Sequence, residues 1–234
     1  PLHLKELAAF CRESGIHRFY GSPGSRSAPI LLSLLRTGNV EVEMLLSKST
    51  DTILLDLVHL LTVNKVSVNG KQVNFVQKND KIYITAKTAF PMGKQTVKVE
   101  YGGEPPIAVR PPWTGGFTFT KDRSGNDWVA INCQKEGGRV YFPCKDHPSD
   151  EPNEGVDMFI TVPENLVVAG PGLLKEVLKK KNKKTYHWKT NYTISNYCTV
   201  FNIGKYAVVS KDYTTIDGTV VPIQFYVLEE DTAY

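Results

Sequence analysis

From about residue 50 onward, apolar and polar residues alternate along much of the chain, most clearly over residues 82–85, 97–100 and 158–162. Successive side chains of a β-strand point to opposite faces, so a period of two buries one face of a sheet and exposes the other. Turn-forming pairs separate these runs, at Asn69-Gly70, Asn79-Asp80, Gly102-Gly103, Gly115-Gly116, Gly137-Gly138 and Asp217-Gly218. The pattern predicts a mainly β chain that forms a twisted, antiparallel-rich β-sandwich.

Bulk properties set a few limits on this prediction. A chain of 234 residues can bury a full core and can hold one large β domain or two small ones. A net charge of +4 is too mild to indicate nucleic-acid binding, and no run of about 18 apolar residues indicates a membrane span. The chain begins at Pro1 without a signal peptide, so we expect a mature or trimmed polypeptide. Both a cytoplasmic and a periplasmic or secreted location stay open.

Residues 131–148 contain the densest group of residues with functional potential, Ile-Asn-Cys-Gln-Lys-Glu-Gly-Gly-Arg-Val-Tyr-Phe-Pro-Cys-Lys-Asp-His-Pro. Two short apolar runs, 128–131 and 140–142, flank a Glu-Gly-Gly-Arg turn. This arrangement predicts a β-hairpin with glycines at its bend. A rigid corner that contains Pro143 follows, and then an acidic loop over residues 149–154.

This segment resembles the amino-terminal domain of the aminopeptidase N and leukotriene hydrolase family of zinc metallopeptidases. That domain carries a Gln/Glu-x-Glu-Gly-x-Arg hairpin followed by an aromatic-Pro-Cys-x-Asp-x-Pro corner and an apolar strand. The matching residues here are Gln134, Glu136, Gly137, Arg139, Phe142, Pro143, Cys144, Asp146 and Pro148. Further segments follow in the family's order, so the resemblance covers residues 38–234 and implies a saddle-like β domain there.

The family's catalytic motifs are missing from this sequence. Its chemistry needs a His-Glu-x-x-His helix, whose two imidazoles bind zinc and whose Glu is the general base, and also a Gly-x-Met-Glu-Asn strand. Neither occurs, and the five histidines are His3, His17, His59, His147 and His187. We therefore expect no catalytic residue, no metal ligand and no cofactor in this chain, with zinc confined to a longer parent enzyme.

The resemblance implies a cleft-capping front domain of a zinc aminopeptidase, inactive when alone. Its partners would be the missing catalytic domain and the amino terminus of a peptide substrate. The alternative is a free-standing β-sandwich interaction domain without enzymatic activity. Exposed apolar surface at the docking position would favour the first hypothesis, and a polar surface would favour the second.

By the same resemblance, Gln134 is the candidate substrate-binding residue, because its counterpart, usually Glu and in some members Gln, holds the free α-amine of the peptide. An acceptor oxygen suits a protonated amine, since a charge-assisted hydrogen bond fixes which end of the peptide enters. Asn132 would lie on the same strand face and line the same cleft. An ordinary polar position at a hairpin explains Gln134 equally well.

The other motif residues are predicted to be structural. Glu136 and Arg139 are expected to pair across the turn, and Asp146 to cap the loop. His147 adjoins Asp146, but neighbouring residues on a strand face opposite ways, so we expect His147 at the surface or lining the cleft rather than in an acid–base pair.

Two further segments left alternatives open. Residues 172–188 show helical spacing at Leu173, Leu174, Val177 and Leu178, whereas the family has a strand pair that turns near Asn182, and we follow the family. The lysines of this segment are expected to be a solvated hairpin tip rather than a nucleic-acid site, because no aromatic residues are interleaved with them. Cys133 and Cys144 are expected to be buried free thiols, with a disulfide as the alternative.

Residues 1–37 differ from the rest and form an atypical leading segment. Leu4, Leu7, Ala8 and Cys11 have the spacing of an amphipathic helix, which predicts a short α/β segment. With the Ser-Pro-Gly-Ser-Arg loop at residues 22–26, it resembles the start of the thiamine-diphosphate-dependent synthase of menaquinone biosynthesis. Ser25 and Arg26 could bind an anion, but without a following cofactor domain we expect a plain turn and no synthase activity.

Overall fold

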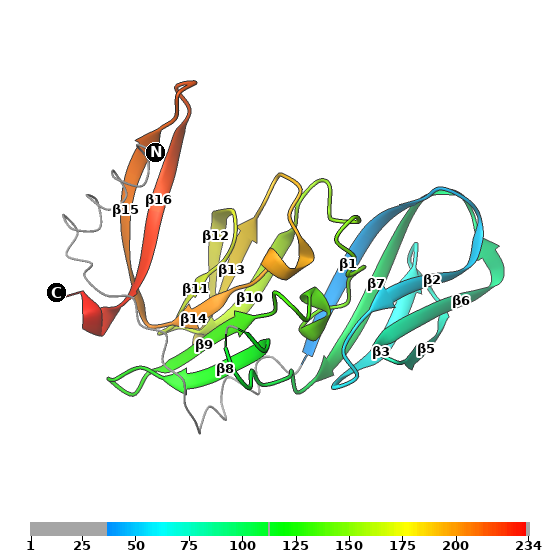
Figure 1. Ribbon diagram of the computed structural model, residues 1–234, viewed down its shortest axis with the longest axis horizontal. Coiled ribbons are helices and arrows are strands. Elements are labelled where there is room, and N and C mark those ends of the chain that lie inside the picture. Colours follow the sequence, from blue (N-terminus) through cyan, green and yellow to red (C-terminus); the bar gives the residue numbers. More distant parts are fainter. Residues whose placement is uncertain (1–36, 112, 233–234) are drawn as a thin grey trace.

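The computed structural model describes residues 37–111 and 113–232, and these residues form two β-sandwich lobes followed by a projecting hairpin (Figure 1). In the first lobe, residues 37–103, two antiparallel sheets face each other. One sheet has the order β1-β7-β3-β4, with bounds Thr37–Leu46, Gly93–Gly103, Leu61–Val68 and Lys71–Gln72. The other has the order β2-β6-β5, with bounds Thr50–Asp56, Lys81–Phe90 and Asn74–Lys78.

The core of the first lobe follows from the alternation in the sequence. In β6, Ile82 and Ile84 are fully buried, whereas the residues between and beside them are only half-buried. Val97 and Val99 of β7 are likewise buried, and the polar residues Lys98 and Glu100 alternate with them. Residues from both sheets join one apolar cluster, so the lobe has its own core.

The second lobe spans residues 104–204. One sheet has the order β11-β14-β9-β8, with bounds Val167–Ala169, Asn202–Gly204, Asp127–Asn132 and Gly116–Lys121. The other has the order β10-β13-β12, with bounds Asp157–Pro163, Lys183–Lys189 and Leu173–Lys180. Two short 3₁₀ helices, η1 (Gly138–Val140) and η2 (Asn196–Cys198), lie in the connections.

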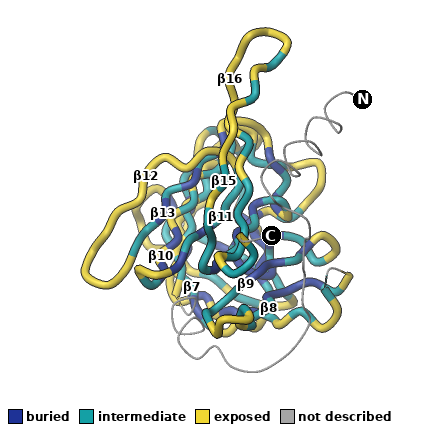
Figure 2. Tube along the Cα trace, turned by 90° about the vertical axis from the view of Figure 1, so that its left-hand side faces the viewer, coloured by how far each residue is buried: buried dark blue, intermediate teal, exposed yellow. Residues whose placement is uncertain are grey.

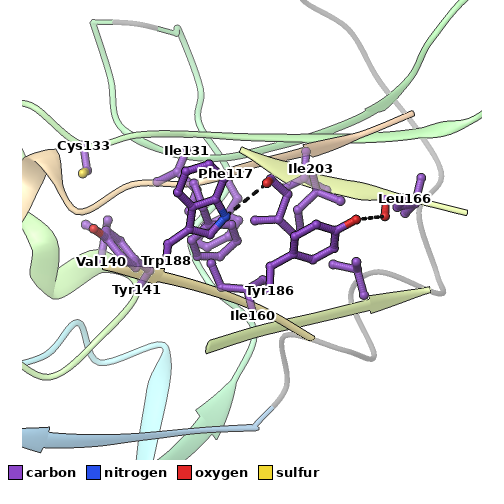
Figure 3. Packing of buried hydrophobic residues seen from close by; sticks show 14 residues of the cluster. Phe117, Ile131, Cys133, Val140, Tyr141, Ile160, Leu166, Tyr186, Trp188 and Ile203 are labelled. Carbon is purple, nitrogen blue, oxygen red and sulfur yellow. Dashed lines mark hydrogen bonds between the residues drawn. The ribbon is translucent and has the colours of Figure 1, made fainter. Parts of the chain in front are cut away.

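The core of the second lobe combines aliphatic side chains with several large aromatic ones (Figure 3). Trp188 is buried, and its indole Nε1 donates a hydrogen bond to the carbonyl oxygen of Val168 at 3.2 Å. The hydroxyl of Tyr186 donates to the carbonyl oxygen of Leu166 at 3.1 Å. The polar atom of each of these two side chains therefore has a hydrogen-bond partner. Without one, burying it would carry a large desolvation cost.

The chain ends in a two-stranded arm, β15 (Tyr206–Thr214) and β16 (Val220–Leu228), followed by the 3₁₀ helix η3 (Glu229–Asp231). The two strands pair along their whole length and project from the second lobe (Figure 1). The base of the arm is anchored to the second lobe: the indole Nε1 of Trp128 donates to the hydroxyl of Tyr206 at 2.6 Å, and Tyr226 packs on Trp188.

The predicted fold class is confirmed, since the described residues are mainly β-strand in antiparallel sandwiches. The strand pair expected over residues 172–188 is present as β12 and β13, and it turns at Lys181-Asn182. Cys133 and Cys144 are buried and free, as expected. Among the described residues, no helix is long and apolar enough to span a membrane. The helix and loop expected within residues 1–36, with Ser25 and Arg26, lie outside the described part of the chain.

One local prediction is wrong. The apolar run 140–142 was expected to be the second strand of a hairpin, but Gly138–Val140 forms η1 and no strand follows β9 until β10. Gly137 adopts φ 84° and ψ 179°, a backbone conformation that is essentially restricted to glycine, and the chain turns sharply there. The run is apolar because Val140 and Tyr141 enter the core of the second lobe, not because it pairs in a sheet.

Candidate functional site

The candidate substrate-binding residues lie where β9 ends. Asn132 is the last residue of β9 and is half-buried, whereas Gln134 is exposed in the turn that follows. The amide of Gly137 donates to the carbonyl oxygen of Cys133 at 2.7 Å and closes this turn. Because Gln134 lies beyond the strand, Asn132 and Gln134 do not occupy successive positions on one strand face. The Gln134 amide is accessible to a ligand.

Glu136 belongs to this turn, and its side chain lies close to Gly115, just before β8. A Cβ atom placed on Gly115 would come within 2.2 Å of Glu136 Oε2 and 2.6 Å of the Asn132 carbonyl oxygen, so only glycine fits at position 115. The Oε2 atom is buried and has no hydrogen-bond partner among the described residues. A buried acceptor without a partner is uncommon, and it places negative potential next to the turn that carries Gln134.

The expected pairing of Glu136 with Arg139 is not what the structure shows. Arg139 Nε lies 3.9 Å from Asp146 Oδ2 instead. Asp146 Oδ1 also accepts a hydrogen bond from the Gly138 amide at 3.2 Å, so the carboxylate caps the first turn of η1. A Cβ atom on Gly137 would lie only 1.8 Å from Asp146 Oδ2, which shows how closely this carboxylate covers the turn.

The Phe-Pro-Cys-Lys-Asp corner joins the two lobes. Asp56 at the end of β2 and Cys144 form a two-way backbone bridge, with N···O distances of 2.7 and 3.2 Å. The Val58 amide donates to the Arg139 carbonyl oxygen at 2.9 Å, and the Asp146 amide donates to Asp56 Oδ2 at 3.1 Å. Pro143, predicted to be structural, is buried in this corner.

A further contact across the lobes involves two tyrosines, Tyr101 and Tyr141. The Tyr101 hydroxyl of the first lobe donates to the Tyr141 carbonyl oxygen at 3.0 Å. The Tyr141 hydroxyl in turn donates to the carbonyl oxygens of Thr199 and, at 3.3 Å, Asn196. The motif therefore holds the turn with Gln134 in a fixed position relative to both lobes.

The two buried cysteines are poor nucleophiles, and His147 does not pair with Asp146. Burial, with nearby Asp146, raises the pKa of the Cys133 thiol to about 12, and burial raises the pKa of Cys144 well above its usual range. Both thiols are thus neutral and poorly reactive near pH 7. His147 is exposed, and its Nδ1 lies 2.8 Å from the Ser149 hydroxyl, so it makes no acid–base pair with Asp146.

The described residues do not offer a zinc site. No group of three histidine, cysteine, aspartate or glutamate side chains comes together in this part of the chain. The histidine–carboxylate contacts that exist are isolated pairs, His59 with Asp80 at 2.9 Å and His187 with Asp157 at 2.6 Å. A catalytic zinc needs three protein ligands, so the donors in this part of the chain do not fit the metal.

Two β-sandwich lobes, joined at the Phe-Pro-Cys-Lys-Asp corner and followed by a projecting two-stranded arm, define a mainly β domain with the exposed Gln134 in the turn after β9. The peptidase M1 N-terminal domain family matches residues 29–198. The chain therefore belongs to this family, and the family prediction made from the Gln134–Pro148 motif is confirmed. The match begins before residue 38 and so includes part of the leading segment.

Solved structures show the same fold. A two-domain M1 zinc metallopeptidase mutant bound to L-arginine superposes with a TM-score of 0.71 at 22% identity, covering 82% of this chain and 43% of that one. An M1 zinc metallopeptidase mutant from Deinococcus radiodurans bound to a Tyr-Ser-Ala substrate gives 0.69 at 22% identity, with the same coverage. The chain thus spans less than half the length of these proteins. No curated protein sequence matches the chain significantly.

Proposed function

We propose that this chain is the amino-terminal, substrate-cleft-capping domain of a zinc aminopeptidase, which removes amino-terminal residues from peptides. The observation that carries the proposal is the family match over residues 29–198, together with a fold match that covers 43% of a two-domain M1 zinc metallopeptidase. The catalytic zinc and its ligands would belong to the rest of the parent protein. In this domain the chain positions substrate and does not cleave it.

Gln134 is the residue we assign to the substrate amine. It is exposed, it lies in a turn held by Asp146 and by the lobe junction, and its side-chain oxygen can accept a hydrogen bond from a protonated amine. The buried Glu136 oxygen in the same turn has no hydrogen-bond partner among the described residues, and its partial negative charge favours a nearby cation. Asn132, half-buried at the end of β9, would line the same side of the cleft.

The arm β15–β16 supports docking of a catalytic domain. It leaves Val208, Ile216, Val220 and Val221 exposed, with Ile216 98% exposed at the tip. A two-stranded hairpin alone is at best marginally stable in water. Exposed apolar side chains on a projecting hairpin indicate a surface that another domain covers. This favours the front-domain function over the alternative, a free-standing interaction domain without enzymatic activity.

The experiment that tests the function is the intact mass of the natural protein, with its zinc content and its aminopeptidase activity. We expect a much longer, zinc-containing enzyme that a chelator inactivates. A natural product of this length, folded and inactive, would overturn the proposal and leave the interaction domain.

In the parent enzyme, Gln134→Ala should raise KM for peptides with a free amine by about tenfold, since one charge-assisted hydrogen bond is lost. Gln134→Glu should lower KM instead, because the added charge strengthens the contact with the amine. Gln72→Ala, an exposed glutamine of β4 in the other lobe, is the matched control and should leave KM unchanged. If all three variants had the same KM, the assignment of Gln134 to the substrate amine would be wrong.

A further inference from the structure

The strand β12 is an open edge of the second lobe. It is the outermost strand of the β10-β13-β12 sheet, and among the described strands it pairs only with β13. All eight of its residues are exposed, and Figure 2 shows it at the periphery of the molecule. An open edge presents unpaired backbone N–H and C=O groups that can hydrogen-bond to another extended chain.

β12 also exposes apolar side chains on both faces of the sheet. Leu174 lies opposite the buried Trp188, and Val177 lies opposite the buried Tyr186, so this pair extends the inner face. Leu178, opposite Thr185, lies on the outer face and is 52% exposed. Natural edge strands are usually protected by being short, by bulges, by proline or by charged side chains, lysine above all. β12 is eight residues long and lacks proline, and it is protected by its lysines and by a register shift between Leu174 and Glu176, so an added strand must bring acidic residues that pair with those lysines.

The charge of the β12–β13 hairpin indicates what kind of chain could cover it. Residues 173–184 include one acidic residue, Glu176, and six lysines, Lys175, Lys179, Lys180, Lys181, Lys183 and Lys184. Within the part of the chain that the structure describes, one of these lysines forms an ion pair, Lys179 with Glu164 at 3.7 Å. A second copy of this strand would bring the same positive charge and be repelled. Nucleic acid is disfavoured because no exposed aromatic side chain of the hairpin offers a stacking surface.

We propose that β12 is a docking edge that accepts an acidic, extended segment of a partner protein as an additional β-strand. Backbone hydrogen bonds along the open edge would supply affinity, and alternating side chains would supply specificity. Apolar residues of the partner would cover Leu174, Val177 and Leu178. Its acidic residues would pair with Lys179 and Lys180. This surface is distinct from the turn with Gln134 and from the arm.

The test uses the 234-residue chain and a set of N-acetylated peptides of about eight to ten residues that alternate Glu or Asp with Val, Leu, Ile or Tyr. Acetylation removes the free amine, so binding at Gln134 does not contribute. Binding is measured by fluorescence anisotropy, and its place by hydrogen exchange. We expect at least one peptide to bind and to slow amide exchange within residues 173–180. A proline in the middle of that peptide should abolish binding, because proline lacks the N–H that pairing needs.

Reversing the charge of two β12 lysines tests whether binding depends on β12 itself or only on the net charge of the chain. Lys179→Glu with Lys180→Glu should weaken binding about tenfold, the combined effect of two modest ion pairs and the repulsion that replaces them. Lys71→Glu with Lys78→Glu, two exposed lysines of the first lobe, changes the net charge equally and should have no effect. Far-ultraviolet circular dichroism checks folding, and Lys179→Gln with Lys180→Gln provides a milder second variant.

Several results would overturn the proposal. One is that no peptide of the set slows exchange within residues 173–180. Another is that the proline-containing peptide binds as well as its parent, or that both double reversals weaken binding equally. If a single-stranded oligonucleotide of equal charge displaces the peptide at the same concentration, the hairpin is a general polyanion site and not a strand-docking edge.

Discussion

Gly137→Ala tests whether the Asp146 carboxylate fixes the turn that carries Gln134. Gly137 has φ 84° and ψ 179°, and a Cβ atom there would lie 1.8 Å from Asp146 Oδ2. The carboxylate cannot stay where it is, so its hydrogen bond to the Gly138 amide must break. The expected result is a large loss of stability from a single added methyl group.

The free energy of unfolding should fall through two contributions. Holding an alanine in a glycine-only backbone region costs about 1–3 kcal/mol. Leaving the buried Gly138 amide without its acceptor costs about 1–3 kcal/mol more. The sum is about 2–6 kcal/mol. For a chain of this size each kcal/mol lowers Tm by about 2–4 °C.

The assay is chemical and thermal denaturation of a double-mutant cycle with Asp146→Ala. Once the carboxylate is gone, Gly137→Ala should cost only the backbone contribution, so the two mutations should be coupled by about 1–3 kcal/mol. Gly218→Ala is the control, because Gly218 also has a positive φ, 85°, but nothing lies within 4 Å of an added Cβ. It should show no coupling to Asp146→Ala.

The reasoning would be refuted by a Gly137→Ala cost that is the same with and without the Asp146 carboxylate. It would also be refuted if Gly137→Ala cost no more than Gly218→Ala. Either result would mean that the turn is set by its own backbone and not by the cap.

Three further predictions concern buried polar groups. The Cys133 thiol, whose pKa burial raises to about 12, should resist iodoacetamide at pH 8 in the native chain and react after denaturation. Burial raises the pKa of Tyr206 to about 12, whereas the pKa of a tyrosine in the unfolded chain is about 10. Stability should therefore fall as pH rises between these values, because only the unfolded chain ionises, and Tyr206→Phe should make the fall shallower in denaturation measured against pH. Tyr141→Phe should cost about 1–2 kcal/mol by leaving the Thr199 carbonyl oxygen without its donor, while exposed Tyr192→Phe should cost nearly nothing.

Local sequence patterns predicted the strands well where one face of a strand is buried and the other exposed. The buried Ile82 and Ile84 of β6 produce a clear period of two. Both faces of β12 are exposed, so its apolar residues do not alternate with polar ones. The spacing of Leu174 and Val177 therefore fits a helix equally well. That segment could be assigned only through the family resemblance.

The sequence could not reveal contacts between distant residues. The run 140–142 was predicted to be a strand because its residues are apolar, but Tyr141 is buried at a junction that joins Cys144 to Asp56. Arg139 was expected to pair with its near neighbour Glu136, yet the turn of η1 brings it to Asp146. The motif identified Gln134 as the candidate residue but placed it on a strand with Asn132, whereas β9 ends at Asn132. The close approach of Glu136 to Gly115, which lies 21 residues earlier, could not be read from the local sequence.

The backbone bridge between Asp56 and Cys144 has a consequence for the order of folding during synthesis. The first lobe is complete once β7 has paired with β1 and β3, so it can fold while the second half of the chain is still being made. The second lobe must wait until β14 has been made, because Ile203 of β14 pairs with Val129 of β9. During that interval Asp56 and Val58 are already in their folded positions. The corner at Cys144 can therefore pair with them as soon as it is made.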